Sequence, residues 1–200
     1  METKTNPQSL VQMPAPQWEA EALVGEEFKK LTLSQFKGKW TVLFFYPLDF
    51  TFVCPTEITA FNDAYKAFKE VNCEVIGCSV DSKFSHLAWA KTPRKEGGLG
   101  KLEIPLLADI TKKIARDYGV LVNESIALRG LFVINPEQKI QYQVVHDLGI
   151  GRNVEETLRI VKALQEVTKT GEVCPANWTP GKQTMKPDPT GSKEFFQKNS

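Results

Sequence analysis

Cys54 is the residue in this 200-residue sequence whose surroundings best suit chemistry. It follows the apolar run 42–46, which is typical of a strand buried on both faces of a sheet. It also precedes Pro55 and a helical spacing of apolar residues, so we expect it in or beside the first turn of a helix. Free N–H groups and the helix dipole favour an anion there, so this thiol is expected to react as thiolate. The alternative is an ordinary buried cysteine, the commoner role of this residue type.

The other three cysteines are of two kinds. Cys73 and Cys78 flank the strand-like run 74–77, which predicts ordinary core thiols. Cys174 shares with Cys54 a following proline at the edge of a structural segment. No pair has C-x-x-C spacing, so the sequence predicts neither a zinc site nor a vicinal redox pair. Four cysteines in an intracellular-looking chain also argue against a structural disulfide framework.

The segments around Cys54 alternate between strand and helix patterns. Beyond the helix that starts near Cys54, strands are predicted over 73–80, 106–108, 131–134 and 139–144. Helices are predicted from Asp81 or Ser82 to Trp89, over 110–118 behind an Asp109 cap, and from Asn153 onward. Strand–helix units followed by a hairpin and a last helix indicate a three-layer α/β fold with a mixed sheet.

The chain changes character at residue 169. Four of its 12 prolines fall in the last 32 residues, where neither a helical nor an alternating apolar period continues. This segment nevertheless carries Cys174, Phe195 and Phe196, and large aromatic residues are poorly suited to lie in water. We therefore predict a folded domain over 1–168 and an extended C-terminal arm over 169–200, which docks on a surface through the two phenylalanines.

The charge balance excludes some classes of function. Lysine and arginine number 25 against 24 aspartates and glutamates, which gives no support for binding nucleic acid or an anionic membrane. Residues 1–20 lack a cationic start followed by an apolar stretch, which argues against a secretory signal peptide. The longest apolar runs have the length of a strand and not of a membrane-spanning helix. We therefore expect a cytoplasmic protein.

Four segments resemble, in order and approximate spacing, the motifs of the peroxiredoxin family. They are PLDFTFVCP at 47–55, GGLG at 97–100, ALRGLF at 127–132 and EVCPANW at 172–178. The similarity runs from about residue 11 to residue 196. It is closest to the typical two-cysteine group, which includes the alkyl hydroperoxide reductase C-type enzymes.

The resemblance implies a thioredoxin-like α/β/α fold and a peroxidase that reduces hydrogen peroxide and organic hydroperoxides without a cofactor or metal. The site residues that it implies are Pro47, Thr51, Cys54, Glu57, Arg129 and Cys174. Cys54 would become a sulfenic acid, the first step of cysteine oxidation. Thr51 and Arg129 would supply donors for the leaving oxygen, while Pro47 shields the pocket and Glu57 orients Arg129. Arg152 is a second candidate cation near the site.

The resemblance also implies that Cys174 comes from a partner subunit and forms an intersubunit disulfide with the oxidised Cys54. Thioredoxin or a dedicated flavoprotein reductase would reopen this disulfide. Disulfide formation would require local unwinding of the helix start, and homodimers would assemble into a decameric ring. Members that are sensitive to overoxidation carry a Gly-Gly-Leu-Gly segment, present at 97–100, and a C-terminal Tyr-Phe pair, which is Phe195-Phe196 in this chain.

Two other functions compete with a peroxidase. A cysteine hydrolase would need a histidine paired with Cys54, and the chain has only His86 and His146. His86 falls on a predicted helix, and His146, which follows the second strand of the predicted hairpin, is expected to be structural. A holdase chaperone that acts as a high-order oligomer is the second alternative, and it is compatible with peroxidase activity.

Overall fold

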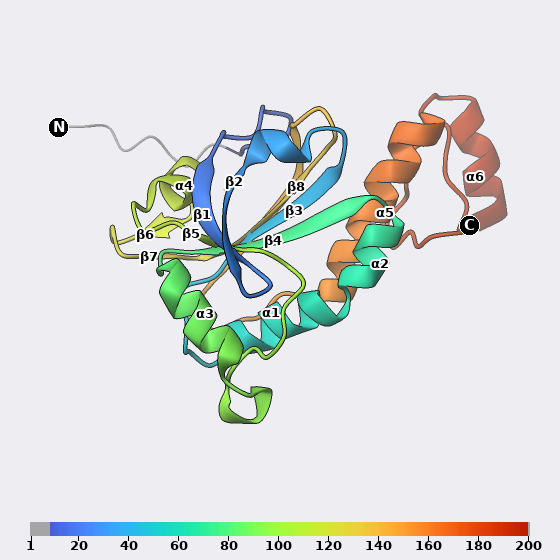
Figure 1. Ribbon diagram of the computed structural model, residues 1–200. Helices are drawn as coiled ribbons and strands as arrows, with labels where there is room; N and C mark the ends of the chain where they lie inside the picture. Colours follow the sequence, from blue (N-terminus) through green and yellow to red (C-terminus); the bar gives the residue numbers. More distant parts are fainter. Residues whose placement is uncertain (1–8, 200) are drawn as a thin grey trace. The chain divides into compact units, whose positions relative to one another are not determined.

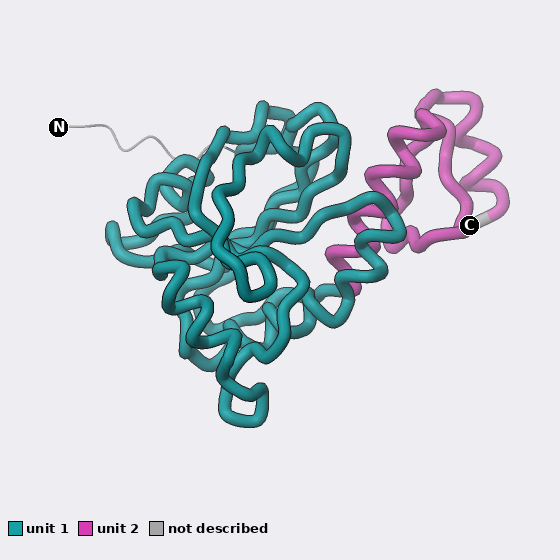
Figure 2. Tube along the Cα trace, in the orientation of Figure 1, with its two compact units in different colours: residues 1–154 teal, residues 155–200 magenta. Residues whose placement is uncertain are grey.

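The computed structural model describes residues 9–199, which fall into two compact units that divide between residues 154 and 155 (Figure 2). The first unit contains the sheet and four of the helices, and the second contains the long helix α5 and the C-terminal segment (Figure 1). No helix within the described range combines the length and the apolar character needed to cross a bilayer.

A mixed seven-stranded sheet forms the centre of the first unit, with strand order β2-β1-β5-β4-β3-β8-β9. Its strands are β1 (Glu19–Val24), β2 (Glu27–Thr32), β3 (Trp40–Phe45), β4 (Cys73–Ser79), β5 (Leu106–Ala108), β8 (Arg129–Ile134) and β9 (Ile140–His146). The neighbours β3, β4 and β5 run parallel, and the other pairings are antiparallel. Every residue of β3, β4 and β8 is buried, as expected for central strands covered on both faces. A short second sheet pairs β6 (Leu121–Val122) with β7 (Ile126–Ala127).

Helices cover both faces of this sheet. They are α1 (Cys54–Asp63), α2 (Tyr65–Glu70), α3 (Lys83–Lys91) and α4 (Lys113–Asp117). Successive residues of a strand point to opposite faces, and Phe44 and Phe45 show the two packings. Phe44 stacks on Phe61 of α1 at 4.6 Å between ring centroids, whereas Phe45 packs at 5.4 Å against Tyr118, directly after α4. The predicted three-layer α/β arrangement with a mixed sheet is therefore confirmed (Figure 1).

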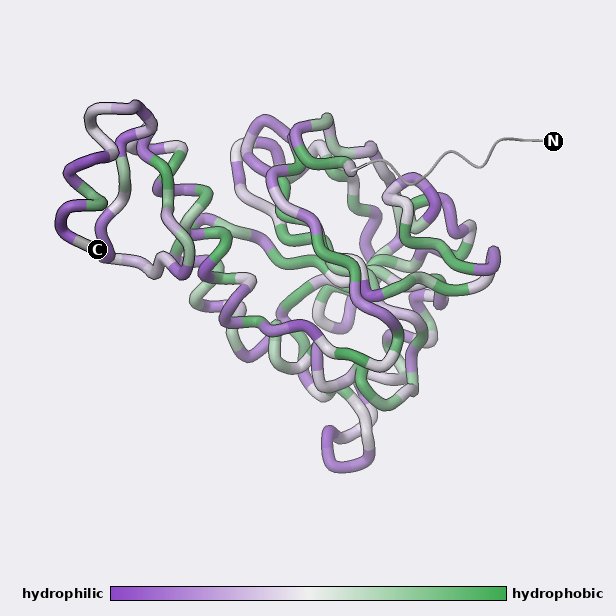
Figure 3. The backbone as a smooth tube through the Cα atoms, turned by 180° about the vertical axis from the view of Figure 1, so that it is seen from behind, coloured by the Kyte–Doolittle hydropathy of each residue, from purple (hydrophilic) through white to green (hydrophobic). Residues whose placement is uncertain are grey.

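Hydrophobic residues are concentrated on the central strands, as the hydropathy colouring shows (Figure 3). One cluster of buried residues lies around Phe45, Tyr118 and Phe132, whose rings meet edge-on or tilted. This packing fixes the C-terminal end of β3, where the chain enters the loop that leads to Cys54.

Several predicted boundaries are wrong for identifiable reasons. The predicted helix over 110–118 begins only at Lys113, because Lys112 adopts the left-handed conformation with a φ of 60°. Asp109 still caps its first turn, since its carboxylate accepts a hydrogen bond from the Ala115 N–H at 2.8 Å. The helix that starts at Cys54 ends at Asp63, and α2 follows after a single residue.

The second unit consists of α5 (Val154–Thr170), an irregular segment with one β-bridge between Val173 and Met185, and α6 (Gly191–Asn199). The expectation that residues beyond 169 form no helix is wrong, because Phe195 and Phe196 lie in α6. Arg159 of α5 donates a hydrogen bond to the Trp178 carbonyl at 2.6 Å, which links α5 to the segment that follows it. The boundary between the two compact units falls between residues 154 and 155 of the chain. The predicted division into a domain and an arm at residue 169 stays a prediction.

Candidate active site around Cys54

Cys54 is the first residue of α1, as its sequence context predicts, and its side chain is fully buried. Val53 is the N-cap, and its carbonyl accepts the first helical hydrogen bonds from Thr56 and Glu57. Pro55 in the first turn needs no N–H partner, so the helix can begin at this point. The sulfur therefore lies at the positive end of the helix dipole.

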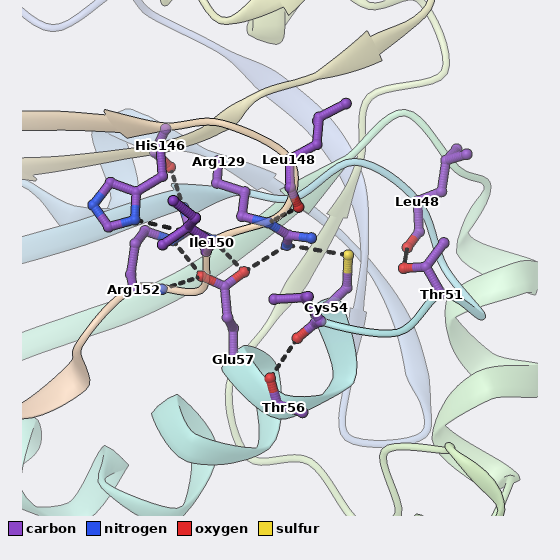
Figure 4. Close-up of polar contacts among 12 residues, drawn as sticks. Leu48, Thr51, Cys54, Thr56, Glu57, Arg129, His146, Leu148, Ile150 and Arg152 are labelled. Carbon is purple, nitrogen blue, oxygen red and sulfur yellow. Dashed lines mark hydrogen bonds and ion pairs between the residues drawn. The ribbon is translucent and has the colours of Figure 1, made fainter.

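Arg129, the first residue of β8, brings a guanidinium to this sulfur (Figure 4). Its Nη1 lies 3.3 Å from Cys54 Sγ and 2.8 Å from a Glu57 carboxylate oxygen, and its Nε donates to the Leu148 carbonyl at 2.8 Å. The strand register explains the position. Phe44 of β3 pairs with Leu131 of β8, so Arg129 comes level with the C-terminal end of β3. Three contacts hold the guanidinium, and its side chain is only 3% exposed.

Glu57 holds both arginines of the site. Its Oε1 accepts hydrogen bonds from the backbone N–H and the Nε of Arg152, both at 2.7 Å, and its Oε2 accepts from Arg152 Nη2 at 2.9 Å and from Arg129. Arg152 also donates to the Gly130 carbonyl and lies over the Phe44 ring. Burial lowers the pKa of Arg152, and its ion pair with Glu57 opposes the shift. Two guanidiniums against one carboxylate leave one positive charge beside Cys54, which a thiolate would neutralise.

Thr51 and Pro47 lie in the loop between β3 and α1. Thr51 is half-buried, and its hydroxyl donates to the Leu48 carbonyl at 2.9 Å. This differs from the predicted donor role, because a hydroxyl that already donates its hydrogen presents lone pairs to any further partner. In Figure 4 Thr51 and Arg129 flank the Cys54 sulfur. Pro47 is buried, and its shielding of the pocket stays a prediction.

Cys174 lies in the second unit after α5 and is half-buried. Its Sγ is 3.7 Å from the Ala163 carbonyl of α5. Burial raises the pKa of this thiol, and Glu166 raises it further. Its pairing with Cys54 stays a prediction. Cys73 and Cys78 are buried in β4, and burial raises the pKa of both thiols, so they suit the core role predicted for them.

The histidines do not form a hydrolase pair with Cys54. His86 is completely buried, with Nδ1 2.8 Å from Asp49 Oδ2 and Nε2 3.1 Å from the Leu107 carbonyl. His146 has its Nδ1 3.3 Å from the Ile150 carbonyl. The buried Asp49–His86 pair was not predicted, because its separation of 37 residues leaves no local signal in the sequence.

Comparisons with known proteins agree with this geometry. A family model described as the AhpC/TSA family matches residues 11–143, and one described as the C-terminal domain of 1-Cys peroxiredoxin matches residues 163–198. The chain is 59% identical over 191 residues to Peroxiredoxin 2 of Drosophila melanogaster, covering 95% of this chain and 98% of that protein. It is 63% identical over 185 residues to the mitochondrial thioredoxin-dependent peroxide reductase of Mus musculus, covering 92% of this chain and 72% of that protein. The reduced 2-Cys peroxiredoxin of Plasmodium vivax, a solved structure, has a TM-score of 0.93 and 48% identity, covering 95% of this chain and all of that one.

Proposed function

Because this chain belongs to the AhpC/TSA family and is a typical two-cysteine peroxiredoxin, we infer that it is a thioredoxin-dependent peroxidase. Its thioredoxin-like fold is that of the solved relatives. One observation within the chain carries the inference: Cys54 begins a helix 3.3 Å from a guanidinium that three polar contacts hold in place. Such a sulfur is arranged to react as an anion.

The first chemical step follows from this arrangement. The Cys54 thiolate attacks one peroxide oxygen, an S–O bond forms and the O–O bond breaks, which leaves a sulfenic acid and an alkoxide or hydroxide. The sulfur loses two electrons to the peroxide, and the leaving oxygen takes up a proton to become an alcohol or water. Arg129 is placed to donate to the peroxide as negative charge develops on the leaving oxygen. Thr51 is placed to accept the peroxide hydrogen, because its own hydrogen is engaged with Leu48.

Magnitudes show that ionisation alone is insufficient. An ordinary thiol is a few per cent thiolate at neutral pH, so complete ionisation accelerates its reactions by about thirtyfold at most. Enzymatic accelerations begin near about a millionfold. The remainder must come from alignment of the peroxide and from charge stabilisation, which are the roles proposed for Thr51 and Arg129.

The second step is condensation of the sulfenic acid with Cys174, which forms a disulfide and releases water. Because Cys54 is fully buried at the start of α1, the first turn of that helix must unwind before another cysteine can reach the sulfur. The pairing is intersubunit in our proposal. Thioredoxin is the favoured reductant, since relatives carry it in their names, and a dedicated flavoprotein reductase is the alternative.

We propose a homodimer that assembles into a decameric ring. Two sets of exposed apolar side chains suit such contacts. Val145, Leu148 and Ile150 lie on or beside β9, which is an edge strand of the described sheet. A second set consists of Phe28, Phe50, Phe52 and Phe84. Native mass spectrometry tests the ring, because Phe84→Asp should convert decamers into dimers. A wild-type protein that remains dimeric would contradict the proposal.

A cytoplasmic location remains our proposal, supported by four unpaired cysteines that suit a reducing compartment. The relatives from Mus musculus and Homo sapiens are described as mitochondrial. Microscopy of the full natural protein with an internal tag distinguishes the two locations, and a mitochondrial signal would contradict our proposal.

The activity is tested by measuring hydrogen peroxide consumption coupled to thioredoxin and its reductase. Cys54→Ser should abolish consumption, whereas Cys174→Ser should allow one turnover and block only recycling by the dithiol. Cys73→Ser is the matched control, since it removes a buried thiol with a raised pKa. Undiminished consumption by Cys54→Ser would refute the function. Holdase activity that is independent of peroxide chemistry would be retained in the Cys54→Ser variant.

A further inference from the structure

A buried polar network lies behind the loop that carries Thr51. Asp49, in that loop, is almost completely buried, and its Oδ1 accepts a hydrogen bond from the Tyr46 hydroxyl at 2.9 Å. Its Oδ2 lies 2.8 Å from Nδ1 of His86 on α3. Its backbone N–H donates to Asp81 Oδ2 at 2.9 Å. The network therefore ties the loop to Tyr46 directly after β3, to the segment that follows β4 and to α3.

The partners of His86 determine where its protons are. Nε2 faces the Leu107 carbonyl of β5 at 3.1 Å, and a carbonyl only accepts, so Nε2 carries a hydrogen. Nδ1 faces a carboxylate oxygen, so the bond to Asp49 also needs a hydrogen between the two atoms. His86 is therefore held by two hydrogen bonds, one to the Leu107 carbonyl and one that shares a hydrogen between Nδ1 and Asp49 Oδ2.

The neighbours of the pair are acids. They are Tyr46, directly after β3, and Asp81, two residues after β4. Burial raises the pKa of Asp81, and the negative charge of Asp49 raises it further. Loss of the bond between His86 and Asp49 would leave a buried carboxylate oxygen without this partner.

The loop depends on these contacts. Phe50, next to Asp49, has a φ of 54°, a conformation that non-glycine residues keep only when their surroundings impose it. Asp49 is fixed on one side of Phe50, and on the other side Thr51 bonds back to the Leu48 carbonyl. Four residues beyond Phe50 the chain reaches Cys54. Anything that releases Asp49 therefore loosens the segment that places Thr51 opposite the sulfur.

We propose that His86 is a positioning residue of the peroxidase: its Nδ1 hydrogen bond to Asp49 holds the loop 47–53 in the form that reacts with peroxide. The proposal rests on the peroxidase activity inferred above. Peroxide reduction should fall when this hydrogen bond is removed.

Two matched amide substitutions test the proposal. Asn places its NH₂ near the position of Nδ1 and does not titrate, whereas Gln places its NH₂ near Nε2 and loses the bond to Asp49. Stopped-flow measurement of Cys54 oxidation by hydrogen peroxide at neutral pH should therefore separate them. His86→Asn should keep a rate near that of wild type, and His86→Gln should be at least about tenfold slower.

Equal rates for the two variants would overturn the proposal. A wild-type protein that does not consume peroxide would instead refute the proposed function. A second measurement remains decisive even if both variants misfold. In the wild-type protein with ¹⁵N-labelled histidine, NMR should show two slowly exchanging hydrogens at the buried histidine ring, one in the bond to Leu107 and one in the bond shared with Asp49, and absence of the second would contradict the proposal.

Discussion

Replacing Arg129 by Gln should remove the positive charge that stabilises the Cys54 anion. Arg129 Nη1 lies 3.3 Å from the sulfur, and at an effective dielectric constant of about 20 two unit charges at this separation interact by roughly 5 kcal/mol. This is an upper bound, because Gln and water would replace part of the interaction. Loss of one preorganised donor to a developing anion typically costs about 3 to 4 kcal/mol, or a factor of about 10² to 10³. We expect the rate constant for peroxide reduction to fall by that factor.

The variant should still fold, since Glu57 would keep its three contacts with Arg152. The assay is stopped-flow oxidation of the reduced protein at neutral pH, in parallel with the rate of alkylation by iodoacetamide. Both rates should fall, because both depend on the thiolate. Arg116→Gln is the matched control, since Arg116 pairs with Glu124 in an exposed position. A loss of less than tenfold for Arg129→Gln would refute our electrostatic explanation of the site.

Three further predictions concern stability and overoxidation. Glu57→Gln should destabilise the protein by about 3 kcal/mol in urea unfolding, because it leaves two buried guanidiniums without their anion, and a loss below about 1 kcal/mol would contradict this. Phe195→Tyr should raise the fraction of Cys54 overoxidised to sulfinic acid by up to about fivefold at a given peroxide dose. The reason is that a new hydroxyl can add a hydrogen bond of about 1 kcal/mol, which delays unwinding of the helix start. Mass spectrometry that finds equal or greater sensitivity in the wild type would refute this. Burial alone would raise the pKa of Glu74, but hydrogen bonds from Lys39 and Lys69 lower it to about 2. Because this folded-state pKa lies below the ordinary value of 4.5, the stabilisation is complete above about pH 4.5 and is lost as the pH falls towards 2. Glu74→Gln should therefore reduce the pH dependence of the unfolding free energy in that range. An unchanged acid transition would contradict this prediction.

Local signals in the sequence were sufficient to predict that Cys54 lies at the start of a helix. A buried apolar run, a cysteine, a proline and a helical apolar spacing follow one another within a short segment, and the structure starts α1 at Cys54. The same applies to β4 and β8, whose apolar runs are continuous because both faces of the sheet are covered.

Other features were missed because their signals are weak or distant. Most of β2 is exposed and charged, as suits an edge strand, so it offers no apolar pattern to recognise. The start of α4 depends on the left-handed conformation of Lys112, a residue with no propensity that would indicate it. The bonds between Glu57 and Arg152 join residues 95 apart in the sequence, so the charge balance of the site could be worked out only from the folded structure.

The central claim is that the Cys54 sulfur, held beside Arg129, is the atom that takes oxygen from the peroxide. The most direct test is to expose the fully reduced Cys174→Ser protein to one equivalent of hydrogen peroxide in the presence of dimedone, and to map the adducts by peptide mass spectrometry. We predict nearly stoichiometric labelling of Cys54, with Cys73 and Cys78 unlabelled. Peroxide consumption with an unlabelled Cys54, or labelling spread equally over the three thiols, would contradict the account.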